Sequence, residues 1–332
     1  MRAVVCSALT GLDGLALGER PDPGAPGPGA VRIRIAAAGL NYADLLVTQG
    51  KYQVKHEPPF VPGFEAAGTI EALGPQVTQL KVGDRVIAIP EAGAFADAAI
   101  VPADRVYPAP NGLDAAEAAG FPIAYGTSYV ALVEQAKLQA GETLLVHGAA
   151  GGVGLTAVEI GKALGARVIA TAGGPDKCAV AAAHGADHVI DYKTEDIRAR
   201  VKELAKDFPG GGVDVVYDPV GGAVFEASLK VVNWNARILV IGFAGGPVPQ
   251  IPANILLVKN VAAMGFYFGS WRQHRPEVVK RAFSSLDGMV HAAQLRPLIS
   301  HRLPLADFRA ALELIQSRQS TGKVVLLTGA AY

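Results

Sequence analysis

The sequence lacks the features that mark disulfide-bonded, nucleic-acid-binding or membrane proteins. It contains only two cysteines, Cys6 and Cys178, and neither belongs to a CxxC or Cys/His cluster, which excludes a disulfide framework and favours two reduced packing thiols. Thirty basic and thirty acidic residues balance, and no run of like charges occurs. We therefore expect no nucleic acid and no anionic membrane as partner, but a small molecule.

Long apolar stretches are absent too. No run of about 18 apolar residues occurs, and the N-terminus "MRAVVCSALTGLDGLALGERPDPG" lacks the apolar core of a signal peptide. No internal repeat is visible. A chain of 332 residues with 50% hydrophobic residues is then expected to be a cytoplasmic protein of about two domains.

The predicted secondary structure changes near residue 123. Up to residue 122, short strand-like runs such as "VRIRIAAAG" and "DRVIAI" are broken by Gly and Pro turn signals, which predicts an antiparallel, loop-rich β domain. From residue 123, apolar strands alternate with helical patterns, which predicts an α/β domain with a parallel, doubly wound sheet of roughly six strands. The last of these strands, "KNVAAMGF", ends at Phe266.

Individual elements follow from the same periodicities. Helices are expected over residues 151–164, 223–232, 276–295 and 305–319, and a last strand over residues 323–329. Because the segment after Phe266 is too short to fold alone, we expect residues 267–332 to complete the first domain. The predicted domains are thus residues 1–122 with 267–332, and residues 123–266.

The segment "LLVHGAAGGVG" combines a buried strand with a glycine-rich turn. Its spacing, Gly148-x-x-Gly151-x-x-Gly154, is a variant of the dinucleotide fingerprint, in which glycines let backbone N–H groups approach a pyrophosphate at a helix N-terminus. A plain tight turn would also use glycines, but strand, loop, helix and strand occur in the required order. We expect this turn, with Gly152 and Val153, to bind the cofactor.

The next strand indicates which nucleotide binds. It ends in Ala172 and Gly173 rather than in an acidic residue that would accept ribose hydroxyls, and Lys177 follows, which favours NADPH. Lys177 is also consistent with a solvated helix residue. Tyr192, at the end of the third strand, could donate to the same phosphate or be a half-buried aromatic residue.

Several segments resemble one protein family. "AAAGLNYADLLVTQGKYQVKHEPPFVPGFEAAGTIEALG", "KVGDRVIA", "AYGTSYVAL" and "VHGAAGGVG" together resemble the medium-chain dehydrogenase/reductase superfamily, and most closely its zinc-free quinone oxidoreductase, or zeta-crystallin-like, branch. The resemblance covers essentially the whole chain. It implies a GroES-like catalytic domain, a Rossmann NADPH-binding domain and a homodimer.

The resemblance also assigns site residues. It places Asn41, Asp44 and Tyr52 at the catalytic site, although Asp44 is equally consistent with an N-cap or loop brace and Tyr52 with a pocket wall. It further implies cofactor contacts at Thr127, Ile241 and Phe243. In the closing segment it makes Arg318 and Lys323 the candidates for a basic residue that reaches the cofactor, although either is also consistent with a solvated charge. Family members often have a tyrosine where this chain has Leu46, which indicates a more apolar substrate site.

Two substitutions bear on metal binding. Zinc-dependent members carry Cys and His where this chain has Asn41 and Phe64, and an amide or a phenyl ring does not replace thiolate and imidazole as zinc ligands. The seven histidines are dispersed without metal-ligand spacing, so a surface or satisfied core role is expected for each. We therefore expect no catalytic metal.

These features together predict a zinc-independent oxidoreductase that uses NADPH to reduce quinones or α,β-unsaturated carbonyl compounds. An enoyl thioester reductase of the same branch is an alternative, for which Trp271, Arg272 and Arg275 are possible anchors. The other alternative is a non-catalytic NADPH-binding sensor or structural protein. The source of the proton that completes the reduction stays unassigned, with water and Tyr52 as candidates.

Overall fold

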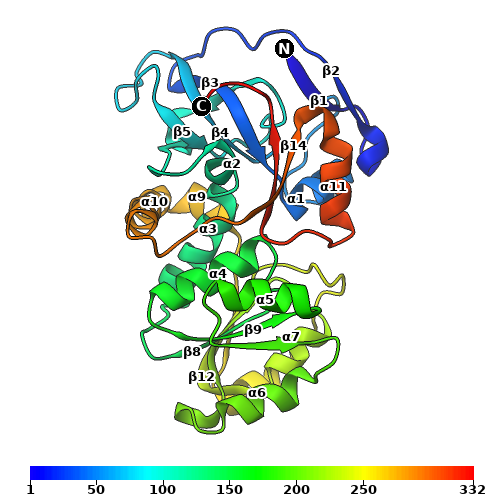
Figure 1. Cartoon of the computed structure of the whole chain (residues 1–332), viewed down its shortest axis with the longest axis vertical. Helices are drawn as coiled ribbons and strands as arrows, with labels where there is room; N and C mark the ends of the chain where they lie inside the picture. Colours follow the sequence, from blue (N-terminus) through cyan, green and yellow to red (C-terminus); the bar gives the residue numbers. More distant parts are fainter. The chain divides into compact units, whose positions relative to one another are not determined.

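The computed structural model describes residues 1–332, which form two compact units (Figure 1). The first unit consists of Met1–Ile123 and Pro297–Tyr332, and the second is Ala124–Arg296. The first boundary lies within one residue of the expected position. The second differs, because residues 267–296 group with the second unit and not with the first. The reason is packing: α10 (Pro276–His291) contacts η3 (Val130–Gln135), and both belong to the second unit.

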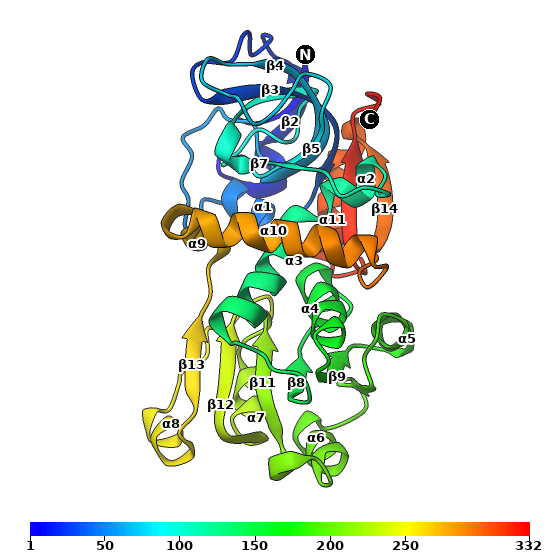
Figure 2. The ribbon, with the colours of Figure 1, turned by 90° about the vertical axis from the view of Figure 1, so that its left-hand side faces the viewer.

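The second unit contains a six-stranded parallel sheet in the order β10-β9-β8-β11-β12-β13. Figure 2 shows five of these strands from left to right, as β13, β12, β11, β8 and β9. Its strands are β8 (Thr143–Val146), β9 (Arg167–Ala172), β10 (His188–Asp191), β11 (Val213–Asp218), β12 (Val232–Val240) and β13 (Ala262–Gly265). All adjacent pairs are parallel. The expected doubly wound sheet is confirmed, and its strand order reverses between β8 and β11.

Helices precede, connect and follow these strands. They are α3 (Pro122–Tyr129), α4 (Gly152–Ala163), α5 (Pro175–Ala183), α6 (Ile197–Ala205), η4 (Pro209–Gly211), α7 (Ala223–Ser228), α8 (Ala253–Lys259) and α9 (Phe268–His274). The helix expected over residues 223–232 is too long, because α7 ends at Ser228 and β12 already begins at Val232. No helix of the chain is both long and apolar enough to cross a bilayer.

The first unit is built on a seven-stranded sheet and a two-stranded sheet. Its strands are β1 (Arg2–Cys6), β2 (Leu15–Glu19), β3 (Ala30–Gly39), β4 (Glu65–Leu73), β5 (Arg85–Ala88), β6 (Ala98–Pro102), β7 (Val106–Pro108), β14 (Ile299–Pro304) and β15 (Lys323–Leu327). All pairs are antiparallel except β14 with β15. Because β15 pairs with the end of β3, the last residues of the chain complete this sheet.

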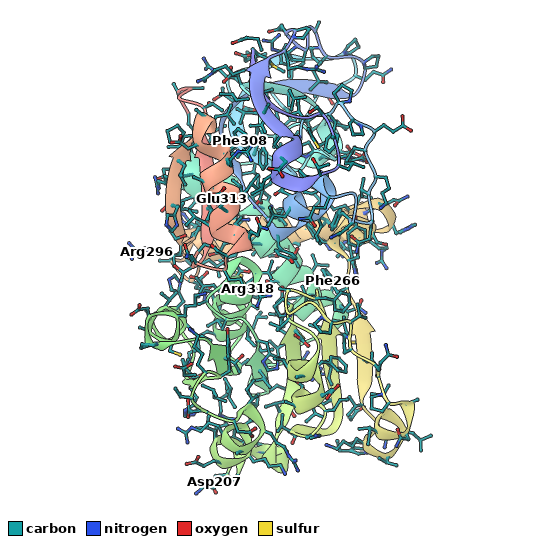
Figure 3. All side chains as sticks on the ribbon, turned by 90° about the vertical axis from the view of Figure 1, so that its right-hand side faces the viewer. Asp207, Phe266, Arg296, Phe308, Glu313 and Arg318 are labelled. Carbon is teal, nitrogen blue, oxygen red and sulfur yellow. The ribbon has the colours of Figure 1, made fainter.

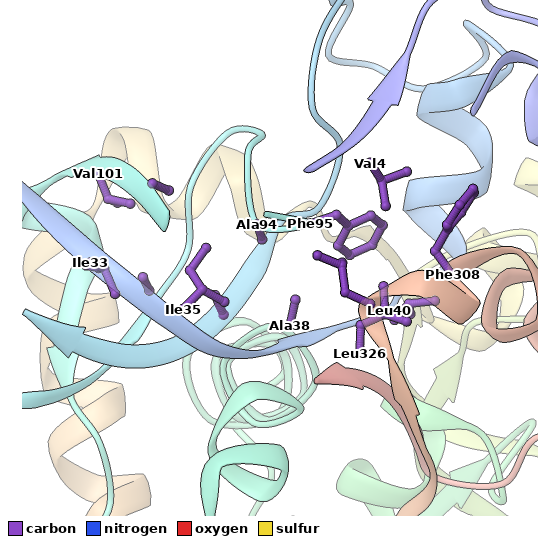
Figure 4. Close-up of a cluster of buried hydrophobic side chains, with 14 of the residues drawn as sticks. Val4, Ile33, Ile35, Ala38, Leu40, Ala94, Phe95, Val101, Phe308 and Leu326 are labelled. Atoms are coloured by element: carbon purple, nitrogen blue, oxygen red, sulfur yellow. The ribbon is translucent and has the colours of Figure 1, made fainter. Parts of the chain in front are cut away.

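Short helices close the first unit around one apolar core. They are η1 (Gly11–Gly14), α1 (Tyr42–Thr48), η2 (Ala103–Arg105), α2 (Ala115–Ala119), η5 (Leu305–Asp307) and α11 (Phe308–Gln316). Figure 4 shows Ile35 and Leu40 from the β3 segment packed with Phe95, Phe308 and Leu326. Burial of each such side chain contributes roughly 1.5–3 kcal/mol, so the core joins the two ends of the chain.

Candidate functional site

The glycine-rich turn joins β8 to α4 at the point where the strand order reverses. Gly148 has φ +59°, a left-handed conformation that favours glycine. The N–H of Ala149 donates to the carbonyl of Thr171 at 3.0 Å, and the N–H of His147 donates to the carbonyl of Tyr217 at 3.0 Å. The turn is therefore fixed to both neighbouring strands, β9 and β11.

The glycines of this turn have different reasons to be glycine. A Cβ on Gly154 would lie 2.2 Å from the carbonyl oxygen of Gly148, so the packing of helix on turn requires glycine there. A Cβ on Gly151 would meet only that same oxygen, at an ordinary 3.4 Å, and the backbone of Gly151 has φ −85°. The protein itself does not need glycine at this position, which leaves space in front of the helix for a ligand.

The start of α4 offers unpaired backbone donors to such a ligand. The first N–H groups of a helix have no carbonyl partner within it, and the N-cap Gly151 has no side chain to accept from them. The N–H groups of Gly152 and Val153 are therefore available, and the helix dipole adds partial positive charge. This arrangement fits a phosphate or pyrophosphate.

The side chain of His147, directly before the turn, is held by two buried hydrogen bonds. Its Nε2 lies 2.8 Å from Ser228 Oγ, whose own hydrogen is donated to the carbonyl of Val224, so the imidazole donates there. Its Nδ1 then accepts from Thr171 Oγ1 at 3.0 Å. Burial lowers the pKa of this histidine, which is fully buried. The expected satisfied core role is confirmed for His147.

A second group of polar side chains follows β9 and β10. A Cβ on Gly173 would lie 2.5 Å from the hydroxyl of Tyr192, and a Cβ on Gly174 would lie 3.7 Å from Nζ of Lys193. Lys177 stands in the first turn of α5, which begins directly after Gly174. The structure thus places a phenol and lysine side chains at the ends of two adjacent strands. Lys193 was missed by the sequence analysis, although it directly follows the "VIDY" strand end.

An acidic residue beside this group, Asp191, is hydrogen-bonded to the backbone. Asp191 ends β10, and its Oδ1 accepts the N–H of Gly174 at 2.9 Å and of Lys193 at 3.0 Å. These backbone hydrogen bonds lower the pKa of Asp191. Its carboxylate therefore stabilises the turn between β9 and α5.

Ile241 and Phe243 lie in the loop after β12, on the same edge of the sheet. The N–H of Ile241 donates to the carbonyl of Asp218 at 2.9 Å, and Phe243 is 39% exposed. Asp218, at the end of β11, accepts the N–H groups of Val220 and Gly221 at 2.8 and 2.9 Å. The loops after β11 and β12 are thereby held together. Since all strands are parallel, the glycine turn, the Tyr192 group and this loop share one edge.

Thr127 and the aromatic segment from Phe266 to Trp271 belong to the same unit. Thr127 is 7% exposed on α3. Phe266 stacks on Trp271 with ring centroids 6.0 Å apart, and Phe268 packs against Gly126, where a Cβ would lie 2.6 Å from its ring. Both phenylalanines are 6% exposed, so this segment contributes to the core of the unit.

In the first unit, Asn41 and Asp44 form the N-terminal cap of α1. Asn41 is the N-cap residue, and Asp44 Oδ2 accepts its backbone N–H at 2.7 Å in a capping box. Asp44 is fully buried, and its Oδ1 has no hydrogen-bond partner. Burial raises the pKa of Asp44 to about 7, against the opposing effects of the Asn41 hydrogen bond and the charge of Lys323.

The side chain of Asn41 belongs to a buried ionic cluster with Glu65 and Lys323. Asn41 Nδ2 donates to Glu65 Oε1 at 2.8 Å. Lys323 Nζ donates to Glu65 Oε1, to Asn41 Oδ1 and to the carbonyl of Leu40, each at 2.7 Å. Glu65 Oε2 accepts the N–H of Ile123 at 2.8 Å. Glu65 is 0% and Lys323 5% exposed.

This cluster gives Lys323 a role inside the first unit, and its expected contact with the cofactor stays a prediction. An ammonium group has three N–H donors, and all three are used inside the first unit. Glu65 was missed by the sequence analysis. Its position beside Phe64 in "GFEAAG" carries no motif for a buried ion pair, because the partner lies 258 residues away in the chain.

Tyr52 and Arg318 are the remaining candidates in the first unit. The Tyr52 ring is partly exposed, with its centroid 5.5 Å from that of Phe64. Arg318 follows α11 and is exposed, with φ +57° (Figure 3). The structure thus brings Asn41, Asp44 and Lys323 together, and it places Arg318 outside that cluster.

The two halves of the chain match known families. Residues 27–111 match the alcohol dehydrogenase GroES-like domain, and residues 152–284 match the zinc-binding dehydrogenase family. A quinone oxidoreductase-like protein 2 homolog from Nematostella vectensis is 39% identical over 98% of this chain and 89% of that protein. A quinone oxidoreductase from Pseudomonas aeruginosa is 36% identical over 92% of this chain and 93% of its own.

Solved structures agree with these matches. The Escherichia coli quinone oxidoreductase complexed with NADPH superposes with a TM-score of 0.89 at 28% identity, covering 98% of this chain and 100% of that chain. A mycobacterial protein complexed with NADPH gives a TM-score of 0.90 at 31% identity, over 98% of this chain and 100% of that chain. The chain therefore belongs to the quinone oxidoreductase branch of the medium-chain dehydrogenase/reductase superfamily.

Proposed function

We propose that this protein is an NADPH-dependent oxidoreductase that reduces quinones or α,β-unsaturated carbonyl compounds without zinc. The observation that carries the proposal is the space in front of Gly151, at the N-terminus of α4 and at the reversal of strand order. The names of the relatives and the NADPH complexes of two structural neighbours support it. When bound, the nicotinamide supplies the hydride.

The residues after β9 and β10 support NADPH over NADH. β9 ends in Ala172 and is followed by two glycines, so the strand itself does not end in an acidic residue that would repel a 2′-phosphate. The nearby Asp191 is held by backbone N–H groups. Lys177, Tyr192 and Lys193 are proposed to hold the phosphate by charge and by hydrogen bonds.

A zinc ion does not fit the residues of the first unit. The oxygen of Asn41, a possible hard ligand, already accepts from the Lys323 ammonium at 2.7 Å, and Phe64 has no donor atom. A second cation beside that ammonium would be repelled. The proposed chemistry therefore suits acceptors that are already polarised, such as quinones and enones, in which a hydrogen bond to the developing oxyanion is sufficient.

The residues proposed to act on the substrate are Asn41 and Tyr52, with Asp44 bracing the helix that Asn41 caps. One Asn41 N–H is not used within the protein, so it can donate to a substrate oxygen. The Tyr52 phenol is a second donor. Thr127, Ile241, Phe243 and Arg318 are proposed as further cofactor contacts.

The proposal is tested by following oxidation of NADPH and, in parallel, of NADH with para-benzoquinone, phenanthrenequinone, a short alkenone and an enoyl-CoA, each with and without EDTA. We expect turnover with a quinone or the alkenone that prefers NADPH and is unaffected by EDTA. Turnover with enoyl-CoA alone would replace the substrate class, loss of activity in EDTA would reject the zinc-free mechanism, and tight NADPH binding without any turnover would favour a sensor.

We also propose that the protein is a homodimer in the cytoplasm. β13 pairs only with β12, so its outer edge is open, and the adjacent α8 exposes 76% of Leu257 and 68% of Val258. An open strand edge beside apolar side chains favours pairing with a second copy. Both cysteines are free thiols, which suits a reducing compartment.

A further inference from the structure

Asn41 is the one residue of the ionic cluster that is partly exposed. Asp44 and Glu65 are fully buried and Lys323 is 5% exposed, whereas Asn41 is partly exposed. A ligand approaching this face of the first unit would therefore meet an amide and no charged group of the cluster.

The cluster determines which way this amide faces. The amide oxygen lies 2.7 Å from the Lys323 ammonium and the amide nitrogen 2.8 Å from the Glu65 carboxylate. The flipped amide would place NH₂ against the ammonium and oxygen against the carboxylate, so both contacts would become repulsive. One N–H is thereby bound to Glu65, and the second N–H is left without a partner.

Lys323 also fixes where the amide stands. Its ammonium joins the carbonyl of Leu40, directly before the N-cap, to the side chain of the N-cap itself and to Glu65 at the start of β4. Lys323 begins β15 and is paired with Ile299 of β14, so its own backbone is held by the sheet. The N-cap residue is thus attached to two strands as well as to its helix.

We propose that Lys323 and Glu65 are positioning residues that hold the Asn41 amide with its free N–H directed outward, as the donor to the substrate oxygen. This role rests on the function proposed above. The ammonium withdraws electron density from the amide oxygen and so strengthens the outward N–H as a donor. Because a carboxamide is neutral and does not titrate, this donor forms a hydrogen bond but transfers no proton.

A double-mutant cycle tests the proposal. Lys323→Met is made in the wild type and in Asn41→Ala, and kcat, KM and the NADPH dissociation constant are measured for each. A misplaced donor is expected to lower kcat by about tenfold to a hundredfold in the wild-type background. In the Asn41→Ala background, the same change should alter kcat by less than about a factor of two, since the group through which Lys323 acts is gone.

Two further variants protect the test against simple misfolding. Lys323→Arg keeps the charge and is expected to restore part of kcat. The double variant Glu65→Gln with Lys323→Met leaves no unpaired buried charge, and it should melt closer to the wild type than Lys323→Met does while kcat stays low. Equal loss of kcat in both cycle backgrounds would overturn the proposal, as would weaker NADPH binding with unchanged kcat.

A measurement without turnover separates this proposal from the proposed function. The side-chain ¹⁵N–¹H signals of Asn41 are identified by their loss in Asn41→Ala, and their exchange with water is recorded without cofactor. We expect one slowly and one rapidly exchanging hydrogen in the wild type, and two rapidly exchanging hydrogens in Lys323→Met. Two rapidly exchanging hydrogens in the wild type would overturn the fixed amide. Absence of turnover together with a fixed amide would count against the reductase and not against the geometry.

Discussion

Gly151 and Gly154 belong to one fingerprint but have different physical reasons to be glycine. Gly154 is required by the carbonyl of Gly148, whereas a Cβ on Gly151 would make only one ordinary contact, at 3.4 Å from the same oxygen. Gly151→Val is therefore expected to place a side chain where the phosphate binds, and to weaken NADPH binding by at least about tenfold, or ~1.4 kcal/mol, with little change in melting temperature. Calorimetric titration with NADPH and a thermal melt of the free protein measure both quantities.

Gly154→Ala is the matched control for that substitution. Its Cβ would lie 2.2 Å from a backbone oxygen, so the free protein should melt at a lower temperature before any cofactor is added. Normal NADPH binding by Gly151→Val would show that the phosphate lies elsewhere.

Lys177 and Lys193 are expected to recognise the group that distinguishes NADPH from NADH. Replacing both by alanine should weaken NADPH binding by about 1.5–3 kcal/mol, the range for hydrogen bonds to charged groups, and leave NADH binding nearly unchanged. The preference should also decrease as salt is added. Lys230→Ala serves as control, because Lys230 is exposed and precedes β12 at the opposite edge of the sheet. A parallel loss of NADH affinity would contradict the assignment.

Site residues that belong to a local pattern could be predicted from the sequence, and those defined by distant contacts could not. The glycine spacing and the lack of an acidic residue at the end of β9 could be predicted, because each feature depends only on residues that are close together in the sequence. Lys323 was predicted as a cofactor contact, but it pairs with residues 282 and 258 positions away. Nothing near "STGKVVLL" indicates a buried ammonium.

At the scale of elements, periodicity located the strands and helices but not every boundary. β12 begins before the apolar run "ARILV" because its pairing with β11 shifts register between Val213 and Val215, and Asn235 has φ +61°. An irregular start of this kind has no period-two signal. Likewise α10 is amphipathic, but an apolar stripe does not indicate which unit it packs against.

The capping box of α1 gives a pH dependence of stability. The pKa of Asp44 is about 7 in the folded state and 3.8 in the reference state, so the folded protein retains a proton that the unfolded chain releases. Stability should therefore fall as pH rises from about 4 to 7, by up to ~1.4 kcal/mol per unit. Asp44→Asn keeps an acceptor for the Asn41 N–H and lacks this titration.

Urea unfolding midpoints at about pH 5 and about pH 8 measure this effect. We expect Asp44→Asn to gain stability relative to the wild type between the two conditions. A difference between the two proteins that does not change with pH would mean that Asp44 is ionised in the folded state as readily as in the unfolded one.

At the scale of the whole molecule, the chain leaves the first unit at Ile123 and returns to it at Pro297. The first unit is therefore incomplete until β15 pairs with β3. The same return brings Lys323 to Asn41 and Glu65, so the proposed substrate donor is assembled only when the last strand is in place. In the first unit, the strand that completes the sheet therefore also carries the lysine that orients Asn41.

The second unit presents the surface from which we propose dimerisation. Pairing of β13 with its copy about a two-fold axis would satisfy the open strand edge and bury Val258 and Leu257 of α8 from both copies. A stable interface of this type buries about 800 Å² per partner, and a charge at its centre should prevent it. Val258→Asp is therefore expected to be monomeric in sedimentation velocity at concentrations where the wild type is a dimer, with an unchanged circular dichroism spectrum.

Val82→Asp introduces the same charge at a valine of the first unit that is 62% exposed, and it should remain dimeric. A monomeric wild type would reject the dimer, and a dimeric Val258→Asp would place the interface on another surface.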